Sequence, residues 1–323
     1  MIYQPNSDTL VTVFGGSGFL GRHVVRALAK RRYRIRVACR RPELANFLQP
    51  LGTVGQIHAV QANVRFPASV EAAVRGLHAV VNLAAILFER GRQRFDMVHA
   101  YGSERVALAA ASFGASLVHV SAIGADPHST SEYARTKAQG ESSVLAAVPG
   151  AVIMRPSILF GPEDDFFNRF AAMARFLPAL PLIGGGETRF QPVFVGDVAE
   201  AIALAVDGKA RPATIYELGG PEVLTFKELM EFMLATIERK RLLVPLPFGL
   251  AKLKAQVLQF LPRPPLTPDQ VELLKTDNVV SDAAKAEGRT LEGLGITPTS
   301  VEAIVPSYLW RFRRMGQFQG RAA

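Results

Sequence analysis

The chain has 323 residues and a formal net charge of +9, and 49% of its residues are hydrophobic while 20% are charged. This composition is typical of a globular protein with one large domain or two fused ones. Its single cysteine, Cys39, excludes an intramolecular disulfide and a cysteine-cluster metal site, and its apolar neighbours predict a packed strand thiol.

The N-terminus and the apolar runs were inspected for targeting and membrane-spanning segments. The first ten residues, MIYQPNSDTL, resemble neither a signal peptide nor a transit peptide. No apolar stretch approaches the roughly 20 residues that span a bilayer. We therefore expect a protein that is soluble or peripheral to a membrane and stays where it is made.

Strands and helices alternate through the first half of the chain. Short apolar runs rich in β-forming residues predict strands, and helical spacing of apolar residues predicts helices between them. Such alternation indicates βαβ units and therefore a Rossmann-type α/β fold, a doubly wound parallel sheet covered on both faces. We expect this domain to cover residues 1–160. The predicted strands are 10–14, 35–39, 57–61, 79–84, 116–121 and 150–155, and the predicted helices are 18–31, 67–75, 98–113 and 132–147.

A glycine-rich segment joins the first strand to the first helix. Its glycines have the GxxGxxG spacing, in which one permits a tight turn, one lets the backbone approach a pyrophosphate and one lets helix and strand pack closely. The pyrophosphate then lies at the helix N-terminus, where free N–H groups favour an anion. The alternative is a glycine-rich turn without a ligand. The residues predicted to hold the pyrophosphate are Gly15, Ser17, Gly18, Phe19, Leu20 and Gly21.

The end of the second strand indicates which dinucleotide binds. Sites selective for NAD place an acidic residue there, whereas this sequence has Arg40 and Arg41. Because a guanidinium binds a 2′-phosphate bidentately, we predict NADP(H) rather than NAD(H). Nine basic residues and no acidic one lie between Arg22 and Arg41, so part of the positive charge would serve this ligand. Alternatively, the two arginines cap a strand at the surface.

Further cofactor contacts are expected where later strands end. Asn63 could reach the adenine, and the small residues Ala84 and Ala85 would let the backbone lie against the cofactor. Tyr133 and Lys137 form a YxxxK pair on one face of the helix predicted at 132–147. The Lys137 ammonium could hold ribose hydroxyls and lower the pKa of Tyr133, making the phenol a proton donor or acceptor beside a hydride transfer.

These motifs resemble the extended or atypical branch of the short-chain dehydrogenase/reductase superfamily. The resemblance implies that Ser121 and Pro156 also lie at the cofactor. Members of this superfamily carry a catalytic Ser or Thr at the end of the fifth strand, but that place falls on Ala122 or Ile123 here. A carbonyl substrate would lose one of its two polarising donors. Tyr133 and Lys137 are therefore doubtful as catalysts, and we expect no independent turnover.

The regular alternation fades after Arg155. Helices are predicted at 165–177, 197–207 and 225–239, a strand at 214–218 and an amphipathic segment at 299–315. We expect residues 161–323 to form a smaller α/β lobe that packs over the ends of the parallel strands, with some segments returning to the Rossmann sheet. Asp164 and Asp165 are predicted to lie in a loop or helix cap, and Asp197 to cap the helix that follows it. The six histidines have no ligand spacing, so we predict no metal site and packing or surface roles instead.

A closer resemblance extends over nearly the whole chain. The segments 155–164, 191–198 and 245–251 look like those of the NADPH-binding accessory subunit of respiratory complex I, the alpha-subcomplex subunit nine family. In that family the nucleotide is a structural element. The resemblance implies complex I subunits as partners. Without a transit peptide the chain resembles a bacterial form, peripheral on the cytoplasmic side of the bacterial cytoplasmic membrane.

Two segments of the second half suit either packing or docking. One helical face near residues 250–261 is apolar, and basic residues stand at its edge. It is either a packed lobe helix or a surface helix that meets a membrane interface or a membrane-embedded partner. The C-terminal run Trp310 to Met315 allows the same two interpretations. No recognition helix or stacking platform indicates nucleic acid. The apolar residues of the helical face are Leu250, Leu253, Val257, Leu258 and Leu261, and the basic ones are Lys252, Lys254 and Arg263.

The leading hypothesis is an NADP(H)-binding accessory subunit of complex I whose cofactor is mainly structural. The alternative is a free NADPH-dependent reductase, dehydratase or epimerase acting on a lipophilic substrate such as a quinone precursor. A redox-sensing regulator is a third possibility that nothing in the sequence requires.

Overall fold

The structure is a computed structural model that describes residues 7–262, 264–314 and 316. Met1–Asn6, Arg263 and Met315, which entered the sequence analysis, lie outside the described residues. The chain forms two compact units. Unit 1 comprises Met1–Pro156, Gly196–Leu218 and Ser281–Ile296, and unit 2 comprises Ser157–Val195, Gly219–Val280 and Thr297–Ala323.

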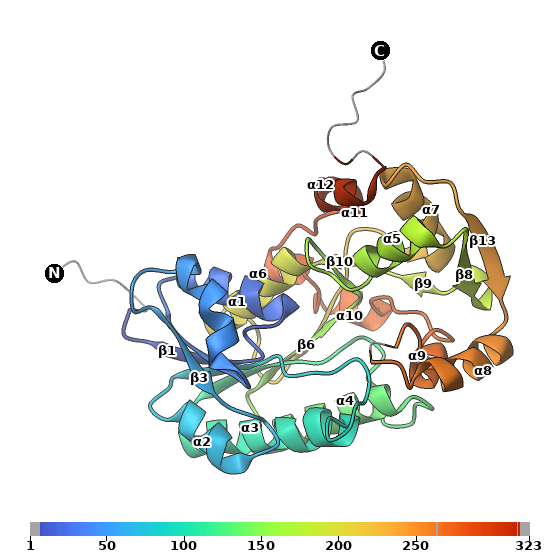
Figure 1. The fold of residues 1–323 in the computed structure, drawn as a ribbon. Helices are drawn as coiled ribbons and strands as arrows, with labels where there is room; N and C mark the ends of the chain where they lie inside the picture. The colour runs from blue at the N-terminus through green and yellow to red at the C-terminus, as the bar shows by residue number, and fades with distance from the viewer. Residues whose placement is uncertain (1–6, 263, 315, 317–323) are drawn as a thin grey trace. The chain divides into compact units, whose positions relative to one another are not determined.

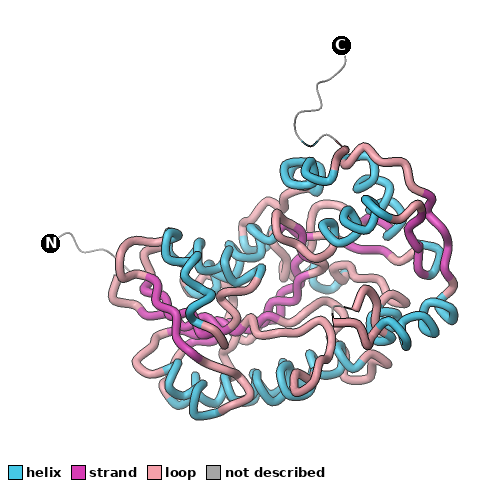
Figure 2. Tube along the Cα trace, viewed as in Figure 1, coloured by secondary structure: helices cyan, strands magenta, loops and turns pink. Residues whose placement is uncertain are grey.

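Unit 1 is built on a seven-stranded sheet in the order β11-β6-β5-β4-β1-β2-β3, and every neighbouring pair in it is parallel. Figure 1 labels its elements, and Figure 2 shows its strands in magenta. The strand order reverses between β1 and β4, which is where open α/β sheets bind their ligands. The prediction of a doubly wound parallel sheet is confirmed. The strands are β1 (Leu10–Phe14), β2 (Arg34–Cys39), β3 (Ile57–Gln61), β4 (Ala79–Asn82), β5 (Ser116–Val120), β6 (Val152–Pro156) and β11 (Ile215–Leu218).

The helices of unit 1 cover this sheet. The central strands are buried nearly end to end, because a parallel sheet with helices on both faces has no solvated side. Arg31 follows the first helix and donates from Nε to Asp207 Oδ2 at 3.0 Å, so the later part of the chain is tied to the first helix. The helices are α1 (Phe19–Lys30), α2 (Pro67–Val74), α3 (Tyr101–Ser112), α4 (Glu132–Ala147), α6 (Val195–Val206) and α10 (Asp282–Ala286), with shorter helical turns at Pro42–Leu51, Asp96–Ala100 and Glu292–Leu294.

Unit 2 contains short helices and three two-stranded sheets around a core rich in phenylalanine. Phe160 and Phe167 meet edge to face in this core, and Phe166 contacts Phe170 and Phe226 in the same way. Its helices are α5 (Phe167–Phe176), α7 (Phe226–Thr236), α8 (Phe248–Leu258), α9 (Pro268–Leu273), α11 (Val301–Ile304) and α12 (Pro306–Leu309), with turns at Gly184–Gly186 and Trp310–Phe312. Its strands are β7 (Leu159–Phe160), β8 (Ala179–Ile183), β9 (Arg189–Phe190), β10 (Val193–Phe194), β12 (Leu224–Thr225) and β13 (Leu242–Leu246).

Three expected helices differ from the structure. The amphipathic segment expected at 299–315 is three short helical pieces, because Pro306 begins a new helix there. The helix expected at 225–239 ends at Thr236. The expectation that Asp197 precedes its helix is wrong: α6 begins at Val195, so Asp197 lies in the first turn, where a carboxylate is still favoured by the helix dipole.

Asp164 does act at a helix start, as predicted. Its carboxylate accepts hydrogen bonds from the backbone N–H groups of Gly161 and Asn168 at 3.2 and 3.0 Å, and from the hydroxyl of Tyr308. The residue is almost fully buried. Asp164 therefore joins the loop before α5 to the C-terminal helices of the same unit.

Among the described residues, no helix combines the length and the apolar character needed to cross a bilayer.

Candidate functional site

The glycine loop packs so closely that side chains are excluded from it. Gly15 has a φ of +77°, a left-handed conformation that favours glycine, and a Cβ built on it would lie 3.1 Å from the backbone of Leu83. A Cβ on Gly21 would lie 2.3 Å from Gly15 O. Gly21 therefore lets α1 rest directly on the loop, and the loop in turn rests on the chain that follows β4.

The N-terminus of α1 is left open to an anion. Its N-cap is Gly18, which makes no side-chain capping bond, and its first turn contains no acidic residue. The first N–H groups of a helix have no partner within the helix, and together with the dipole they attract a phosphate. A pyrophosphate fits these residues, because the helix offers donors and positive potential, and Gly15, Gly18 and Gly21 carry no side chain. Contact of Ser17, Phe19 and Leu20 with that group stays a prediction.

The predicted 2′-phosphate residues lie at the surface where β2 ends. Arg40 and Arg41 are exposed, and Arg40 Nη1 donates to Gln93 Oε1 at 2.6 Å. Cys39 is buried, as predicted for a packed strand thiol, and burial raises its pKa. Asn63 follows β3, but its Oδ1 already accepts hydrogen bonds from Arg65, so an adenine would have to use its Nδ2 or displace that arginine.

Small residues follow β4, where the expected strand 79–84 ends two residues early, at Asn82. Ala84 is half-buried, Ala85 is exposed, and the Ala84 N–H donates to Asn82 Oδ1 at 3.2 Å. Asn82 itself is buried and donates to Ser103 Oγ. Pro156 is buried at the end of β6. The predicted cofactor residues therefore follow the carboxyl ends of successive parallel strands, which share one edge of the sheet.

The Tyr133 and Lys137 pair lies on α4, whose bounds are those predicted. Lys137 is fully buried and its Nζ donates to Val120 O, at the end of β5, at 2.9 Å. Burial lowers the pKa of Lys137 to about 8, while Glu141 acts to raise it. Tyr133 is half-buried at the start of the same helix. The lysine is thus held at the strand end, one turn along the helix from the tyrosine.

Ser121 directly follows β5, which ends at Val120, one residue before the end expected from the sequence. Its N–H donates to Met154 O at 2.7 Å, which extends the sheet by one bond. Its hydroxyl is buried, and within the described residues it has no hydrogen-bond partner. A buried hydroxyl without a partner costs free energy, so this oxygen marks a position suited to a polar ligand atom. The next residues, Ala122 and Ile123, supply no hydroxyl.

Two buried histidines lie near Lys137, and the sequence analysis assigned them no role at the site. His99 packs edge to face against Tyr133, with ring centroids 5.2 Å apart, and lies within hydrogen-bond distance of Thr136. His119 lies beside Asn82, and its Nε2 has no partner among the described residues. Burial, with Lys137 nearby, lowers the pKa of His99 to about 2 and that of His119 to about 3, so both rings are neutral. The only sequence signal was their place after β4 and within β5.

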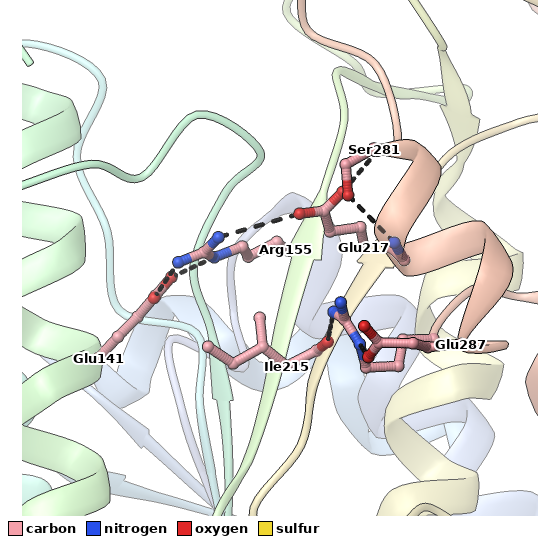
Figure 3. Close-up of polar contacts among 8 residues, drawn as sticks. Glu141, Arg155, Ile215, Glu217, Ser281 and Glu287 are labelled. Carbon is pink, nitrogen blue, oxygen red and sulfur yellow. Dashed lines mark hydrogen bonds and ion pairs between the residues drawn. The ribbon is translucent and has the colours of Figure 1, made fainter.

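An arginine clamp holds α4 to the sheet, and it too was missed (Figure 3). Arg155 on β6 binds Glu141 bidentately, at 2.8 and 2.6 Å, and its Nη1 lies 3.9 Å from Glu217 Oε1 on β11. Glu217 Oε2 in turn accepts the N–H of Ser281, the N-cap of α10. Because Glu141 lies one turn beyond Lys137, the clamp fixes the helix that carries the predicted site residues.

The structure bears on the two segments for which packing and docking were both considered, the helical face near residues 250–261 and the run that begins at Trp310. The large apolar residues expected on one face near 250–261 are mostly exposed, and α8 buries only Ala251 and Ala255. The interpretation as a packed lobe helix is therefore wrong for the apolar face. Trp310 is partly exposed, and its Nε1 donates to Ser307 O, so it is neither fully packed nor fully free. In the described parts of the chain, no cluster of His, Cys, Asp and Glu is arranged to hold a metal.

The chain matches a known family model over most of unit 1. Residues 11–219 match the NAD dependent epimerase/dehydratase family. A nicotinamide dinucleotide is thus the cofactor of the family, in agreement with the open helix N-terminus and the glycine loop.

Individual relatives refine this assignment. The chain is 36% identical over 324 residues to NADH dehydrogenase (ubiquinone) 1 alpha subcomplex subunit 9, mitochondrial, of Arabidopsis thaliana, covering 96% of this chain and 79% of the relative. Two solved structures share the fold. The NADPH-dependent quinone oxidoreductase of Escherichia coli, complexed with NADPH, has a TM-score of 0.73 at 19% identity over 93% of this chain and 99% of its own. The dTDP-glucose 4,6-dehydratase of Streptomyces venezuelae, with NAD bound, has a TM-score of 0.71 at 21% identity over 94% and 96%.

Identities this low show the fold alone, and the two structures hold different dinucleotides. The family rests instead on the matched model and on the 36% identity across nearly the whole chain. The chain therefore belongs to the NAD dependent epimerase/dehydratase family and, within it, to the family of NADH dehydrogenase (ubiquinone) 1 alpha subcomplex subunit 9.

Proposed function

We propose that this chain is an NADP(H)-binding accessory subunit of respiratory complex I and that it holds its nucleotide mainly as a structural element. The observation that carries the proposal is the contact between Gly21 and Gly15, which leaves no room for a Cβ and opens the α1 N-terminus to a pyrophosphate. The family membership supports complex I subunits as partners, because the relative is a subunit of NADH dehydrogenase (ubiquinone).

A structural role for the nucleotide is supported by the groups around the reactive position. Ser121 is buried at the strand end, and the residues after it carry no hydroxyl. A carbonyl substrate at the position where related enzymes carry their catalytic Ser or Thr would find Tyr133 but, at Ala122 or Ile123, no hydroxyl as the second polarising donor, a loss of about a hundredfold or more in rate. Lys137 and Tyr133 then serve to bind the nicotinamide ribose.

NADP(H) is favoured over NAD(H) by the arginines after β2. Arg40 and Arg41 are exposed and able to turn toward a 2′-phosphate, and no acidic side chain stands at either position to accept from a ribose hydroxyl. Arg40 would exchange its bond to Gln93 for the charge-assisted bond to phosphate, which is the stronger of the two.

We further propose that the protein is peripheral to the bacterial cytoplasmic membrane, on its cytoplasmic side, with complex I subunits as partners. The nucleotide would stabilise the fold that the partners recognise. Purification of the tagged protein from solubilised membranes should recover it with complex I. Its recovery as a free monomer under the same conditions would contradict this location and partnership.

Nucleotide identity gives the first direct test. Denaturing the purified protein should release about one equivalent of NADP(H), identified by its phosphate and oxidation state. Release of NAD(H) would overturn the choice of dinucleotide. If nothing is released, and neither reduced coenzyme changes the melting temperature, the proposal of a nucleotide-holding subunit fails.

Replacing both arginines tests the 2′-phosphate site. The double variant Arg40→Gln, Arg41→Gln should bind NADPH about tenfold to a hundredfold more weakly and leave NADH binding unchanged, because only the phosphate loses its charge-assisted bonds. Isothermal titration calorimetry with both nucleotides measures this. Arg26→Gln, an exposed arginine of α1, is the control, since it removes charge without touching the strand end. Equal weakening for both nucleotides would contradict the assignment.

A second candidate is a free NADPH-dependent reductase, dehydratase or epimerase acting on a lipophilic substrate. The retained Tyr133 and the buried Lys137 favour it. Tyr133→Phe separates the two functions: it should abolish turnover if the chain is such an enzyme, and it should leave co-purification with complex I intact if the chain is an accessory subunit.

A further inference from the structure

Helix α8 of unit 2 buries two small residues and leaves three of its five large apolar residues exposed. Ala251 and Ala255 are fully buried and share a small cluster with Ile183 and with Val271 of the neighbouring helix α9. Figure 1 shows α8 and α9 side by side. Phe248 and Leu258 are half-buried, and Phe248 packs against this cluster, whereas Leu250, Leu253 and Val257 stay exposed.

The outward apolar residues of α8 and of the turn after it are named the α8 apolar stripe. Leu250, Leu253 and Val257 are spaced three and four residues apart, so they share one side of α8. Two further apolar residues follow in the turn after the helix. Leu253 is 62% exposed, and Phe260, in the turn that follows the helix, is 84% exposed. Single exposed apolar residues are ordinary, but a row of large ones marks a surface that binds something. The α8 apolar stripe consists of Leu250, Leu253, Val257, Phe260 and Leu261.

The segment that contains α8 carries charge of one sign, and the nearest acidic groups belong to α9. From Arg239 to Pro268 the sequence contains six basic residues and no acidic one. Lys252 is joined to Glu272 of α9 at 2.7 Å, whereas Lys254 is exposed at the edge of the stripe and makes no ion pair among the described residues. An acidic surface that accepts apolar side chains is the complement of such a face, and an anionic lipid bilayer combines both properties.

We propose that α8 lies flat in the headgroup region of an anionic bilayer, with the α8 apolar stripe among the acyl chains and Lys254 among the phosphates. Its 11 residues are about half of what a spanning helix needs, so the helix lies in the interface. Lysine stems reach along the apolar surface while their ammonium groups stay at headgroup level. The inference deepens the proposed peripheral location and rests on it.

Vesicle binding by the full chain tests this. Sedimentation with phosphatidylcholine vesicles that contain phosphatidylglycerol should retain the protein, whereas pure phosphatidylcholine vesicles should bind it much more weakly. The double variant Leu253→Ser, Val257→Ser should bind the anionic vesicles about tenfold or more weakly, because two large apolar groups no longer enter the bilayer. Lys254→Gln should weaken binding about fivefold, and added salt should reduce that difference.

The matched control is the pair Leu44→Ser, Val54→Ser in unit 1. Leu44 is 61% exposed and Val54 is fully exposed, so the control removes equally accessible apolar groups from another surface. It should leave vesicle binding unchanged. Equal loss in both double variants would overturn the assignment to α8. The melting temperature and the NADPH response of each variant confirm that it is folded.

If the α8 apolar stripe binds a partner other than a lipid bilayer, these experiments give different results. If the stripe docks on a membrane-embedded protein, the chain binds neither kind of vesicle, but the Leu253→Ser, Val257→Ser variant loses co-purification with complex I. If it docks on a second copy, sedimentation velocity shows a dimer that this variant abolishes. Either result refutes the lipid proposal and leaves nucleotide binding by unit 1 intact. Failure of the proposed function is recognised separately, by the absence of nucleotide.

Discussion

Helices α1 and α8 have nearly the same length and similar apolar residues, yet their surroundings differ. The 12 residues of α1 bury Leu20, Val24, Val25 and Leu28 beside β1 and β2. The 11 residues of α8 bury two alanines and leave most of their larger apolar residues in solvent. The comparison shows that an apolar face only makes a helix able to pack against something. Whether it packs within the chain depends on which other elements lie against that face.

Truncating one leucine on each helix is the strongest test of this comparison. Leu28→Ala should lower the free energy of unfolding by about 2–5 kcal/mol, because Leu28 is fully buried and its loss leaves a cavity. Leu253→Ala should change it by about 0.5 kcal/mol or less, as for surface substitutions elsewhere. Urea unfolding of both variants measures the difference. Similar losses would mean that α8 is packed within the chain in solution.

Adding one methyl group to a glycine of each helix sharpens the comparison. Gly21→Ala should destabilise the protein by about 3 kcal/mol and impair NADPH binding, because the new Cβ clashes with the loop backbone, and backbone atoms cannot move away as a flexible side chain can. Gly249→Ala should stabilise it by about 0.5–1 kcal/mol, since nothing lies within 4 Å of that Cβ and alanine favours the helix. Thermal unfolding with and without NADPH reports both effects. A tolerated Gly21→Ala would refute the close contact on which the cofactor loop depends.

A buried lysine in unit 1 and an exposed one in unit 2 extend the comparison to charge. The pKa of Lys137 is about 8 in the folded protein and about 10.5 when unfolded, so in this window the unfolded chain holds a proton that the folded chain has released. The free energy of unfolding should therefore gain about 1.5 kcal/mol from Lys137 as the pH rises from 8 to 9.5. Lys137→Met should lose that gain, and the exposed control Lys254→Met should keep it. Parallel pH profiles for wild type and Lys137→Met would contradict the predicted titration.

Much of unit 1 could be predicted because its signals are local. Strand and helix periodicities depend on residues a few positions apart, and α4 was expected with the bounds Glu132–Ala147 that the structure has. The glycine spacing follows from the geometry of one tight turn, so Gly15, Gly18 and Gly21 were recognisable before any contact was known. Helix ends were predicted less well, as with α7, because capping and tertiary contacts decide where the last turn frays.

The sequence by itself determined the parallel α/β architecture, the glycine loop and the presence of an apolar helical face near residues 250–261. Only the tertiary structure decided that this face points outward, that His99 and His119 are buried beside Lys137, and that Arg155 clamps Glu141 and lies beside Glu217. The reason is that these residues are far apart in the sequence. Glu141 and Glu217 are 14 and 62 residues from Arg155, and no local pattern specifies which distant carboxylates will lie beside that arginine.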